Sequence, residues 1–176
     1  GCSQAMLEDA LEVTLALTSE MLVLGGKAKD DAGARVLLHE AMKSGAAERK
    51  LKEIVAAQGG NPNAIFDLSL LPRARELVAV KAPKDGVVTA IASEAIGLAA
   101  MMLGAGRAKS SDVIDPAVGF MLEKKVGDPV KAGEALVTMH VNDDARVKEV
   151  TERVIAAYSI GATAPAPRPL VLERIG

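Results

Sequence analysis

The first sixty positions alternate apolar and polar residues at helical spacing. From Leu7 to Leu24 apolar residues return every three or four positions, and Gly25-Gly26 follow as a helix stop. Apolar residues also occupy the other side of this helix, which indicates neighbours on more than one face and a surface that favours association. The spacing predicts a second helix from Asp30-Asp31 to Ser44-Gly45 and a third over Ala46–Ala57. The inward positions expected on these two helices are Ala34, Leu37, Leu38, Ala41, Ala47, Leu51, Ile54 and Val55.

After the turn-forming cluster at residues 58–63, the period changes to that of β-strands. Residues 77–80 and 86–91 are expected as strands around a turn at residues 83–86, and residues 119–126 and 135–141 as a second strand pair. Two helices are expected beside these strands, over Ala95–Leu103 and Ala145–Tyr158, and an Ala/Pro-rich tail leads into a short apolar run at residues 170–175.

This order of elements predicts an α+β chain. We expect residues 1–58 to be a helical segment of a larger α/β domain and residues 59–75 to be a linker. Residues 76–163 would form a small α+β module in which two strand pairs pack against two helices, and residues 164–176 a tail with a short strand.

The amino-acid composition argues against a nucleic-acid partner and against membrane association. The 176 residues include 49% apolar residues, a net charge of −2 and only three aromatic residues, Phe66, Phe120 and Tyr158. A nucleic-acid partner is not expected, because neither a basic footprint nor a set of stacking rings is available. No membrane association is expected either, since the uncharged stretch from Ala95 to Gly106 is too short to span a bilayer. One cysteine, Cys2, allows no disulfide within the chain and favours a cytoplasmic setting.

The segment Gly104-Ala105-Gly106-Arg107 combines a glycine-rich turn with a guanidinium, a combination that can hold a phosphate. However, these glycines follow the predicted helix, whereas a phosphate-binding loop usually precedes one. We therefore interpret the segment as a helix C-terminal cap and expect Arg107 to be a structural residue near the negative end of the helix dipole.

The remaining candidates for chemistry are two histidines and two acidic pairs. His39 is expected on a helix surface and His140 half-buried at the end of a strand, and neither has a second histidine or cysteine at metal-ligand spacing. Asp30-Asp31 and Asp143-Asp144 each precede a helix, where capping is the expected role. No nucleophile elbow, Walker loop or dinucleotide fingerprint occurs. The residues therefore indicate no catalytic group, no metal site and no cofactor.

Residues 127–136 read Gly-Asp-Pro-Val-Lys-Ala-Gly-Glu-Ala-Leu and resemble one half of a biotinyl or lipoyl carrier domain, in which the Val and the Leu seal a small barrel. A carrier also exposes a modifiable lysine at a hairpin tip, typically within Met-Lys-Met or Asp-Lys-Ala. Here Lys124-Lys125 are expected inside a strand, and neither triplet occurs. The pattern predicts a half barrel without carrier chemistry, and a stand-alone carrier-like binding module is the alternative function.

Several segments taken in order carry a family resemblance. They are residues 14–17, 20–22, 31–35, 56–60 and 71–72, then Leu103-Gly104-Ala105-Gly106-Arg107, Asp112, Ile114-Asp115, Ala117-Val118-Gly119 and Val126-Gly127-Asp128. In this order they resemble the C-terminal portion of the pyrimidine-nucleoside phosphorylase and thymidine phosphorylase family, from about Leu11 to the tail. Residues 1–4 fit no segment of that family.

The resemblance implies a pentosyltransferase of pyrimidine nucleoside metabolism and nucleotide salvage. Enzymes of that family are cytoplasmic homodimers that convert a pyrimidine nucleoside and phosphate into the base and a pentose 1-phosphate. Their substrate-binding groups include a Lys-His-Ser segment, an Arg with a Ser and a Lys, and a Ser-Gly-Arg-Gly-Leu segment, all earlier in the chain. None has a matching position here, so no catalytic residue is carried over. We expect a structural fragment that is inactive alone and whose partner is the missing N-terminal half of the same enzyme.

Overall fold

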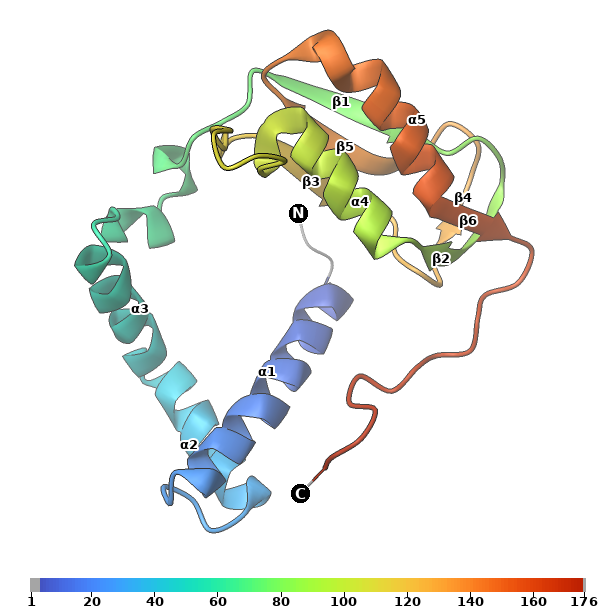
Figure 1. Cartoon of the computed structure of the whole chain (residues 1–176). Helices are drawn as coiled ribbons and strands as arrows, with labels where there is room; N and C mark the ends of the chain where they lie inside the picture. Colours follow the sequence, from blue (N-terminus) through green and yellow to red (C-terminus); the bar gives the residue numbers. More distant parts are fainter. Residues whose placement is uncertain (1–3, 176) are drawn as a thin grey trace. The chain divides into compact units, whose positions relative to one another are not determined.

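The computed structural model describes residues 4–175 of the chain, with side chains from residue 7 onward (Figure 1). Two compact units are present. The first holds the chain up to Leu68 and again from Arg168 onward, and the second holds Ser69–Pro167. Each unit is described below by itself.

Three helices make up most of the first unit. They are α1 (Gln4–Leu24), α2 (Asp31–Lys43) and α3 (Ala46–Ala57), as the apolar spacing predicted. Asp30 caps α2, because its carboxylate accepts a hydrogen bond of 2.8 Å from the Gly33 N–H. The short 3₁₀ helices η1 (Pro62–Ile65) and η2 (Leu68–Leu70) follow, and the ammonium of Lys52 lies 3.9 Å from the ring centre of Phe66.

An ion pair ties α1 to α2. The Arg35 guanidinium donates to both carboxylate oxygens of Glu12, at 2.8 and 3.0 Å, and to Asp31 at 3.0 Å. These hydrogen bonds hold the pKa of Glu12 below its usual value. Leu15 and Ser19 of α1 and Ala34 of α2 are buried. Two of these three are small, which allows the helices to approach closely.

Half of the inward positions expected on α2 and α3 are exposed. On α2, Ala34 is buried and Leu38 and Ala41 are half-buried, but Leu37 is exposed. Among the described residues of α3 none is buried, and Leu51 and Ile54 are 48% and 45% exposed. Ala47 is exposed and Val55 half-buried. Helical spacing placed these residues on one stripe of each helix, and within the described part of the first unit that stripe is only partly covered.

Two three-stranded antiparallel sheets form the second unit. One has the order β1 (Glu76–Lys81), β5 (Ala135–Val141), β3 (Gly119–Leu122), and the other β4 (Pro129–Val130), β2 (Gly86–Ile91), β6 (Tyr158–Gly161). The strands at 77–80 and 86–91 are therefore confirmed, but they do not pair with each other as expected. Instead β1 ends at a register shift between Val80 and Lys81, and the Ala82 N–H donates to the Glu134 carbonyl. This bond turns the chain out of the first sheet and sends β2 into the second.

Two helices lie side by side over one face of the first sheet (Figure 1). The first is α4 (Ser93–Ala100), continued by a π-helical turn, η3 (Met101–Ala105). The second is α5 (Val147–Ala157), preceded by the 3₁₀ turn η4 (Asp144–Arg146). The expected helix over Ala145–Tyr158 is thus too long by one residue, because Tyr158 opens β6 and pairs with Ile91. In the tail, residues 164–175 contain no strand, contrary to expectation.

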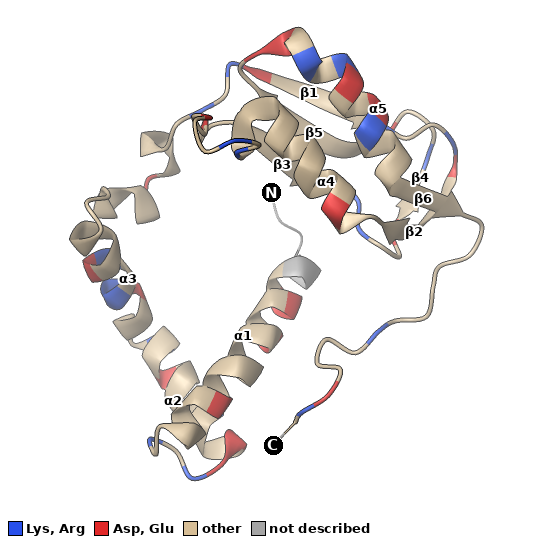
Figure 2. Ribbon diagram, in the orientation of Figure 1, with Lys and Arg blue, Asp and Glu red and all other residues tan. Residues whose placement is uncertain are grey.

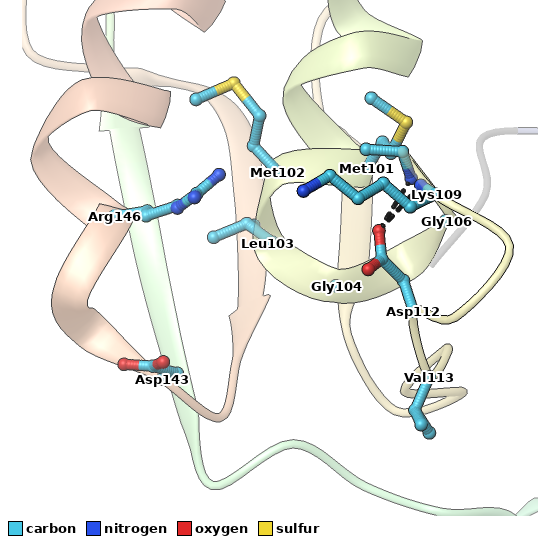
Figure 3. A pocket seen from close by; sticks show the side chains of 11 residues that line it. Met101, Met102, Leu103, Gly104, Gly106, Lys109, Asp112, Val113, Asp143 and Arg146 are labelled. Carbon is cyan, nitrogen blue, oxygen red and sulfur yellow. Dashed lines mark hydrogen bonds between the residues drawn. The ribbon is translucent and has the colours of Figure 1, made fainter.

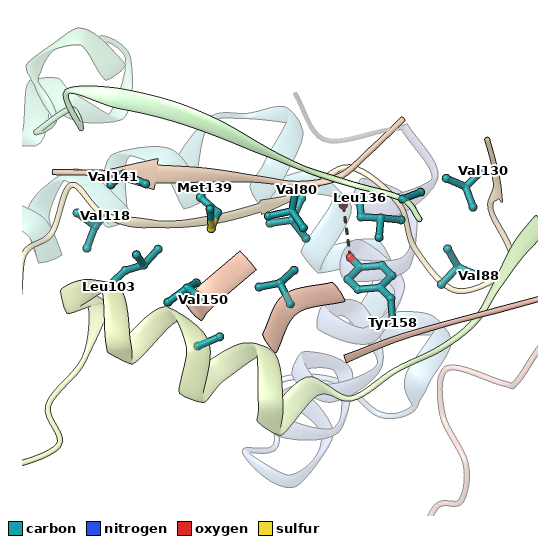
Figure 4. Packing of buried hydrophobic residues seen from close by; sticks show 14 residues of the cluster. Val80, Val88, Leu103, Val118, Val130, Leu136, Met139, Val141, Val150 and Tyr158 are labelled. Carbon is teal, nitrogen blue, oxygen red and sulfur yellow. Dashed lines mark hydrogen bonds between the residues drawn. The ribbon is translucent and has the colours of Figure 1, made fainter. Parts of the chain in front are cut away.

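The hydrophobic core of this unit lies between the sheets and the two helices (Figure 4). Strand β5 supplies Leu136, Val137, Met139 and Val141, all fully or almost fully buried. Helix α5 adds Val150 and Val154, and the turn at the end of α4 adds Leu103. The α+β class predicted from the sequence is confirmed. No helix in the described chain is long and apolar enough to cross a membrane.

The Tyr158 hydroxyl is the polar group closest to this core. It donates to the carbonyl of Lys124 at 3.1 Å and lies 3.4 Å from the carbonyl of Leu136 (Figure 4). Burial, together with the nearby charge of Asp128, raises the pKa of Tyr158 to about 12. Because this value lies above the ordinary value of 10.0, the neutral hydroxyl contributes its full stability below pH 10.0 and loses it as the pH rises through about 12.

We predict that the free energy of unfolding of the 176-residue chain falls more steeply between pH 10 and 12 than that of Tyr158→Phe, which has no hydroxyl to ionise. At pH 8 the variant should be less stable by about 0.5–1.5 kcal/mol, the contribution of one hydrogen bond. Urea titrations at several pH values measure both quantities. Parallel pH profiles for the two proteins would contradict the assignment.

Helix α1 exposes an apolar stripe made of Leu17, Met21 and Leu24. These residues are 64%, 69% and 85% exposed and follow one another at helical spacing. We predict that the 176-residue chain self-associates through this stripe at high concentration and that Leu17→Gln with Leu24→Gln weakens the association. Light scattering against concentration is the measurement. Val113→Gln, which removes an equally exposed apolar residue from a loop, is the matched control and should leave association unchanged.

Candidate functional site

The Gly104-Ala105-Gly106 turn ends α4 in a conformation that requires glycine. Gly104 has φ 107°, a value that side chains other than glycine rarely adopt. Gly106 is extended, and a Cβ there would lie 3.2 Å from the Cγ of Met101. The glycines therefore terminate a helix, as the sequence predicted, and let the chain fold back against Met101.

The loop that follows is held by two aspartates. One carboxylate oxygen of Asp112 accepts the N–H groups of Ala108 and Lys109, at 3.0 and 2.9 Å. Asp115 donates its own N–H to the Gly104 carbonyl and accepts the N–H of Ala117 on its side chain, both at 2.9 Å. Loop 106–118 is thereby anchored at both ends.

Asn142, at the end of β5, connects this loop to the first sheet. Its side-chain N–H donates to Asp115 at 2.7 Å, and its side-chain oxygen accepts the backbone N–H of Arg75 at 2.8 Å. The hydrogen bond from Asn142, followed by that from Ala117, lowers the pKa of Asp115. The carboxylate of Asp115 is thus a charged structural anchor.

A pocket of about 520 Å³ opens between this loop and the start of α5 (Figure 3). Its apolar wall is η3, with Met101, Met102 and Leu103. Its polar lining comes from the loop and from the segment before α5, namely Lys109, Asp112, Asp143 and Arg146. A smaller pocket of about 270 Å³ lies at the other side of Asp143, and its lining is mainly polar: Arg75, Glu76, Asn142, Asp143 and Asp144 with Val141.

Arg107 is exposed and does not line either pocket. In the described chain its guanidinium makes no hydrogen bond or ion pair. The expected interaction with the negative end of the helix dipole needs no such bond and stays a prediction. The backbone carbonyl of Gly104, at the end of this helix, accepts a hydrogen bond from the Asp115 N–H.

The histidines and acidic pairs occupy the places that the sequence predicted. His39 is exposed on α2, and His140 is half-buried on β5 between Leu77 and Gly119. Asp143 accepts the Ala145 N–H at 3.0 Å as a cap of η4, just as Asp30 caps α2. Among residues 4–175 no three histidine, cysteine, aspartate or glutamate side chains gather where a metal ion could be held.

The turn that resembles a carrier domain is held by its own acidic residues. Asp128 accepts the Lys125 N–H at 2.7 Å, Glu134 accepts the Lys131 N–H at 2.9 Å, and Asp85 accepts the Ala132 N–H at 2.7 Å. The Lys131 N–H, followed by Lys124, lowers the pKa of Glu134. The Val and the Leu of the pattern, Val130 and Leu136, are buried as expected.

Lys124-Lys125 do not lie inside a strand, which corrects the expectation from the sequence. Strand β3 ends at Leu122, and the two lysines lead into the turn at residues 126–127. Lys124 is nevertheless engaged, since its ammonium donates to the Pro129 carbonyl at 3.0 Å and lies 3.3 Å from Glu134. A modifiable carrier lysine must be free at a tip, so the carrier function is not favoured.

Sequence reasoning missed three residues that matter at this end of the unit: Lys109, Asn142 and Arg146. Asn142 follows β5 and connects Arg75, just before β1, with the loop. Lys109 and Arg146 are 37 positions apart in the sequence. Only their convergence on one pocket makes them notable, and no local pattern signals it.

Comparison with known proteins identifies the relatives of this chain. Residues 87–161 match the model of the pyrimidine nucleoside phosphorylase C-terminal domain. The pyrimidine-nucleoside phosphorylase of Bacillus subtilis is 47% identical over 161 residues, which cover 92% of this chain and 37% of that protein. The enzyme of the same name from Geobacillus stearothermophilus is 42% identical over 96% of this chain and 39% of its own length. One from Staphylococcus aureus is 44% identical over 89% of this chain and 37% of its own length.

The chain thus spans less than two fifths of the length of these relatives. The segment that matches the domain model begins at β2, ends with β6 and includes the glycine turn, loop 106–118 and β5. These include the later segments on which the resemblance was based, from Leu103 to Asp128. The chain belongs to the pyrimidine-nucleoside phosphorylase family and represents a C-terminal portion of it.

Proposed function

We propose that this chain is the structural C-terminal portion of an enzyme that cleaves pyrimidine nucleosides with phosphate and that it is inactive alone. In that reaction a phosphate oxygen forms a bond to the anomeric carbon of the pentose, and the bond from this carbon to the pyrimidine nitrogen breaks. The leaving base takes the electron pair and gains negative charge. Catalysis therefore needs cations and hydrogen-bond donors around both the phosphate and the base.

The observation that carries this proposal is the uneven coverage of the alignments. About nine tenths of this chain aligns with relatives named pyrimidine-nucleoside phosphorylases, but about three fifths of each relative lies outside the alignment. The resemblance assigns the phosphate- and base-binding groups to segments earlier in the chain. The matching portion then supplies support rather than chemistry.

The hydrogen bonds of the second unit agree with a supporting role. The carboxylates of Asp112, Asp115, Asp128 and Asp143 each accept a backbone N–H of a turn or a cap. A general acid or base must instead present its carboxyl group to a substrate within hydrogen-bond reach. These aspartates are committed to the shape of the module.

The proposal includes the organisation expected from the sequence. Residues 1–58 would belong to the large α/β domain of the whole enzyme, residues 59–75 would be a linker, and residues 76–163 would form the module. We further propose that the turn between β4 and β5 closes a half barrel of the biotinyl or lipoyl type, supported by buried Val130 and Leu136. The proposal also includes a homodimeric, cytoplasmic enzyme in which the N-terminal half is the partner of this portion. This part of the proposal is based on the family resemblance.

We predict that the purified 176-residue chain does not turn over thymidine or uridine with phosphate in excess. The change in ultraviolet absorbance on release of the base measures turnover. The whole Bacillus subtilis relative serves as the positive control. Release of base that copurifies with the chain through several columns would overturn the proposal.

A chimera tests the supporting role directly. We predict that the Bacillus subtilis enzyme remains active when its matching 161-residue segment is replaced by that of this chain, because the two segments are 47% identical and the segment is proposed to be structural. Activity within tenfold of the parent is the expected result. A chimera with native circular dichroism, a cooperative melting curve and no activity would show that the segment carries groups specific to another reaction.

Arg107 provides a test of the one guanidinium in the glycine turn. Because it lies outside the pockets and has no partner in the described chain, we predict that Arg107→Ala in the chimera leaves the KM for phosphate within twofold. A charged hydrogen bond contributes about 1.5–3 kcal/mol. Loss of a true phosphate contact would therefore raise this KM more than tenfold and would place Arg107 in the active site. Arg153→Ala, on an exposed face of α5, is the matched control.

A further inference from the structure

Two positively charged side chains that make no ion pair in the described chain line the pocket beside loop 106–118. Lys109 comes from the loop and Arg146 from the turn before α5, and both line the pocket. Figure 3 shows the two charged ends pointing into the same space, next to Met102 and Leu103. Within the described chain neither the Lys109 ammonium nor the Arg146 guanidinium makes an ion pair or a side-chain hydrogen bond.

Backbone hydrogen bonds fix the two segments that carry Lys109 and Arg146, whereas the charged ends of these side chains make no hydrogen bond or ion pair of their own in the described chain. The N–H of Lys109 is bound by Asp112, and the Gly104–Asp115 hydrogen bond closes the base of the loop. Arg146 ends η4, which Asp143 caps. The side chains remain available for a ligand, while the segments that carry them are fixed.

The two carboxylates of the lining also hold the backbone. One oxygen of Asp112 accepts two backbone N–H groups, and one oxygen of Asp143 accepts the Ala145 N–H. In Figure 3 the guanidinium of Arg146 points away from Asp143. The charged side chains of the lining that can donate hydrogen bonds to an anion are Lys109 and Arg146, and a planar guanidinium beside an ammonium suits the oxygens of a phosphate group.

The apolar wall indicates what accompanies the anion. Met101 and Met102 are half-buried and lie on the π-helical turn, and Leu103 lies behind them in the core. Methionine side chains adapt to flat apolar or aromatic groups. The volume of about 520 Å³ is within the range of small-molecule sites and far exceeds the needs of an inorganic ion.

We propose that this pocket binds an organic phosphate monoester, with the phosphate between Lys109 and Arg146 and an apolar or aromatic group against Met101 and Met102. The proposal does not depend on nucleoside phosphorolysis. It assigns a binding role to the portion of the chain that otherwise supports the fold.

Titration of the isotope-labelled 176-residue chain by NMR, at constant ionic strength, tests the proposal. The probes are phenyl phosphate, inorganic phosphate and phenol. We expect phenyl phosphate to bind most tightly, by at least fivefold over inorganic phosphate, and phenol not to bind. Shifted amide signals should cluster at residues 101–113 and 143–147.

Two variants and one control identify the groups responsible. Lys109→Gln and Arg146→Gln should each weaken phenyl phosphate binding at least tenfold, because each removes a charged hydrogen bond. Lys148→Gln removes the same charge from an exposed position on α5, outside the pocket lining, and should change binding less than twofold. Amide spectra of each variant confirm that the fold is retained.

Three results would overturn the proposal. One is the absence of shifts at 10 mM phenyl phosphate, and another is equal binding by both variants and the unaltered chain. The third is equal affinity for phenyl and inorganic phosphate, which would remove the role of the methionine wall. Activity is not part of the readout, so an inactive chain leaves this test intact and the two proposals fail independently.

Discussion

Strand β5 is the element on which the second unit depends. It forms antiparallel ladders with β1 on one side and β3 on the other, so its backbone groups are paired along both edges. Leu136, Val137, Met139 and Val141 place four apolar side chains of this one strand in the core. Truncation of such a side chain to alanine costs about 2–5 kcal/mol, a large share of the stability of a small domain.

The carbonyl of Leu136 shows how closely the surrounding chain is fitted to this strand. It accepts the N–H groups of Glu123 and Lys124, and the Tyr158 hydroxyl lies beside it. The segment after β3 and the first residue of β6 are thereby fixed to β5 at one point. At the other end of β5, Asn142 fixes β1 and loop 106–118.

Most acidic side chains around β5 serve the turns that this central strand imposes. A strand with neighbours on both sides forces the connecting segments to fold back sharply, and their backbone N–H groups then lack partners in a sheet. Asp85, Asp112, Asp115, Asp128 and Glu134 accept those N–H groups. The same arrangement leaves Lys109 and Arg146 without carboxylate partners, and the proposed anion site is based on these two side chains.

The first unit follows a different principle. Its helices are held to each other by a few contacts, chiefly the Arg35–Glu12 pair, and Leu15 and Ala34 are buried, while long apolar stripes remain exposed. Figure 2 shows both acidic and basic residues along α3. The exposed apolar residues of this helix, Leu51 and Ile54, therefore lie on a helix that also carries charged side chains. Helices with exposed apolar faces usually pack against further secondary-structure elements. In the proposed whole enzyme those elements would come from the remaining length of the chain.

The sequence by itself determined the elements that depend on local rules. Helical spacing and a capping aspartate placed α2 and α3 correctly, glycines at Gly104 and Gly106 marked the end of α4, and the alternation in residues 86–91 gave β2 its observed bounds. The buried Val130 and Leu136 also followed from a local pattern. An ordered series of short segments was enough to indicate the family.

Only the tertiary structure decided which strands pair, which faces are covered and which distant residues meet. The turn after β1 resembles a hairpin turn, but a bond from Ala82 to Glu134, 52 positions away in the sequence, sends β2 into another sheet. Leu51 and Ile54 have the spacing of buried residues, yet burial depends on a neighbouring layer that no local pattern contains. Lys109 and Arg146 share a pocket because β5 and its two anchored loops bring them together. Strand pairing, the burial of a helix face and the meeting of distant residues depend on the whole packed unit. Residue spacing predicts only the type and the apolar face of a single helix or strand.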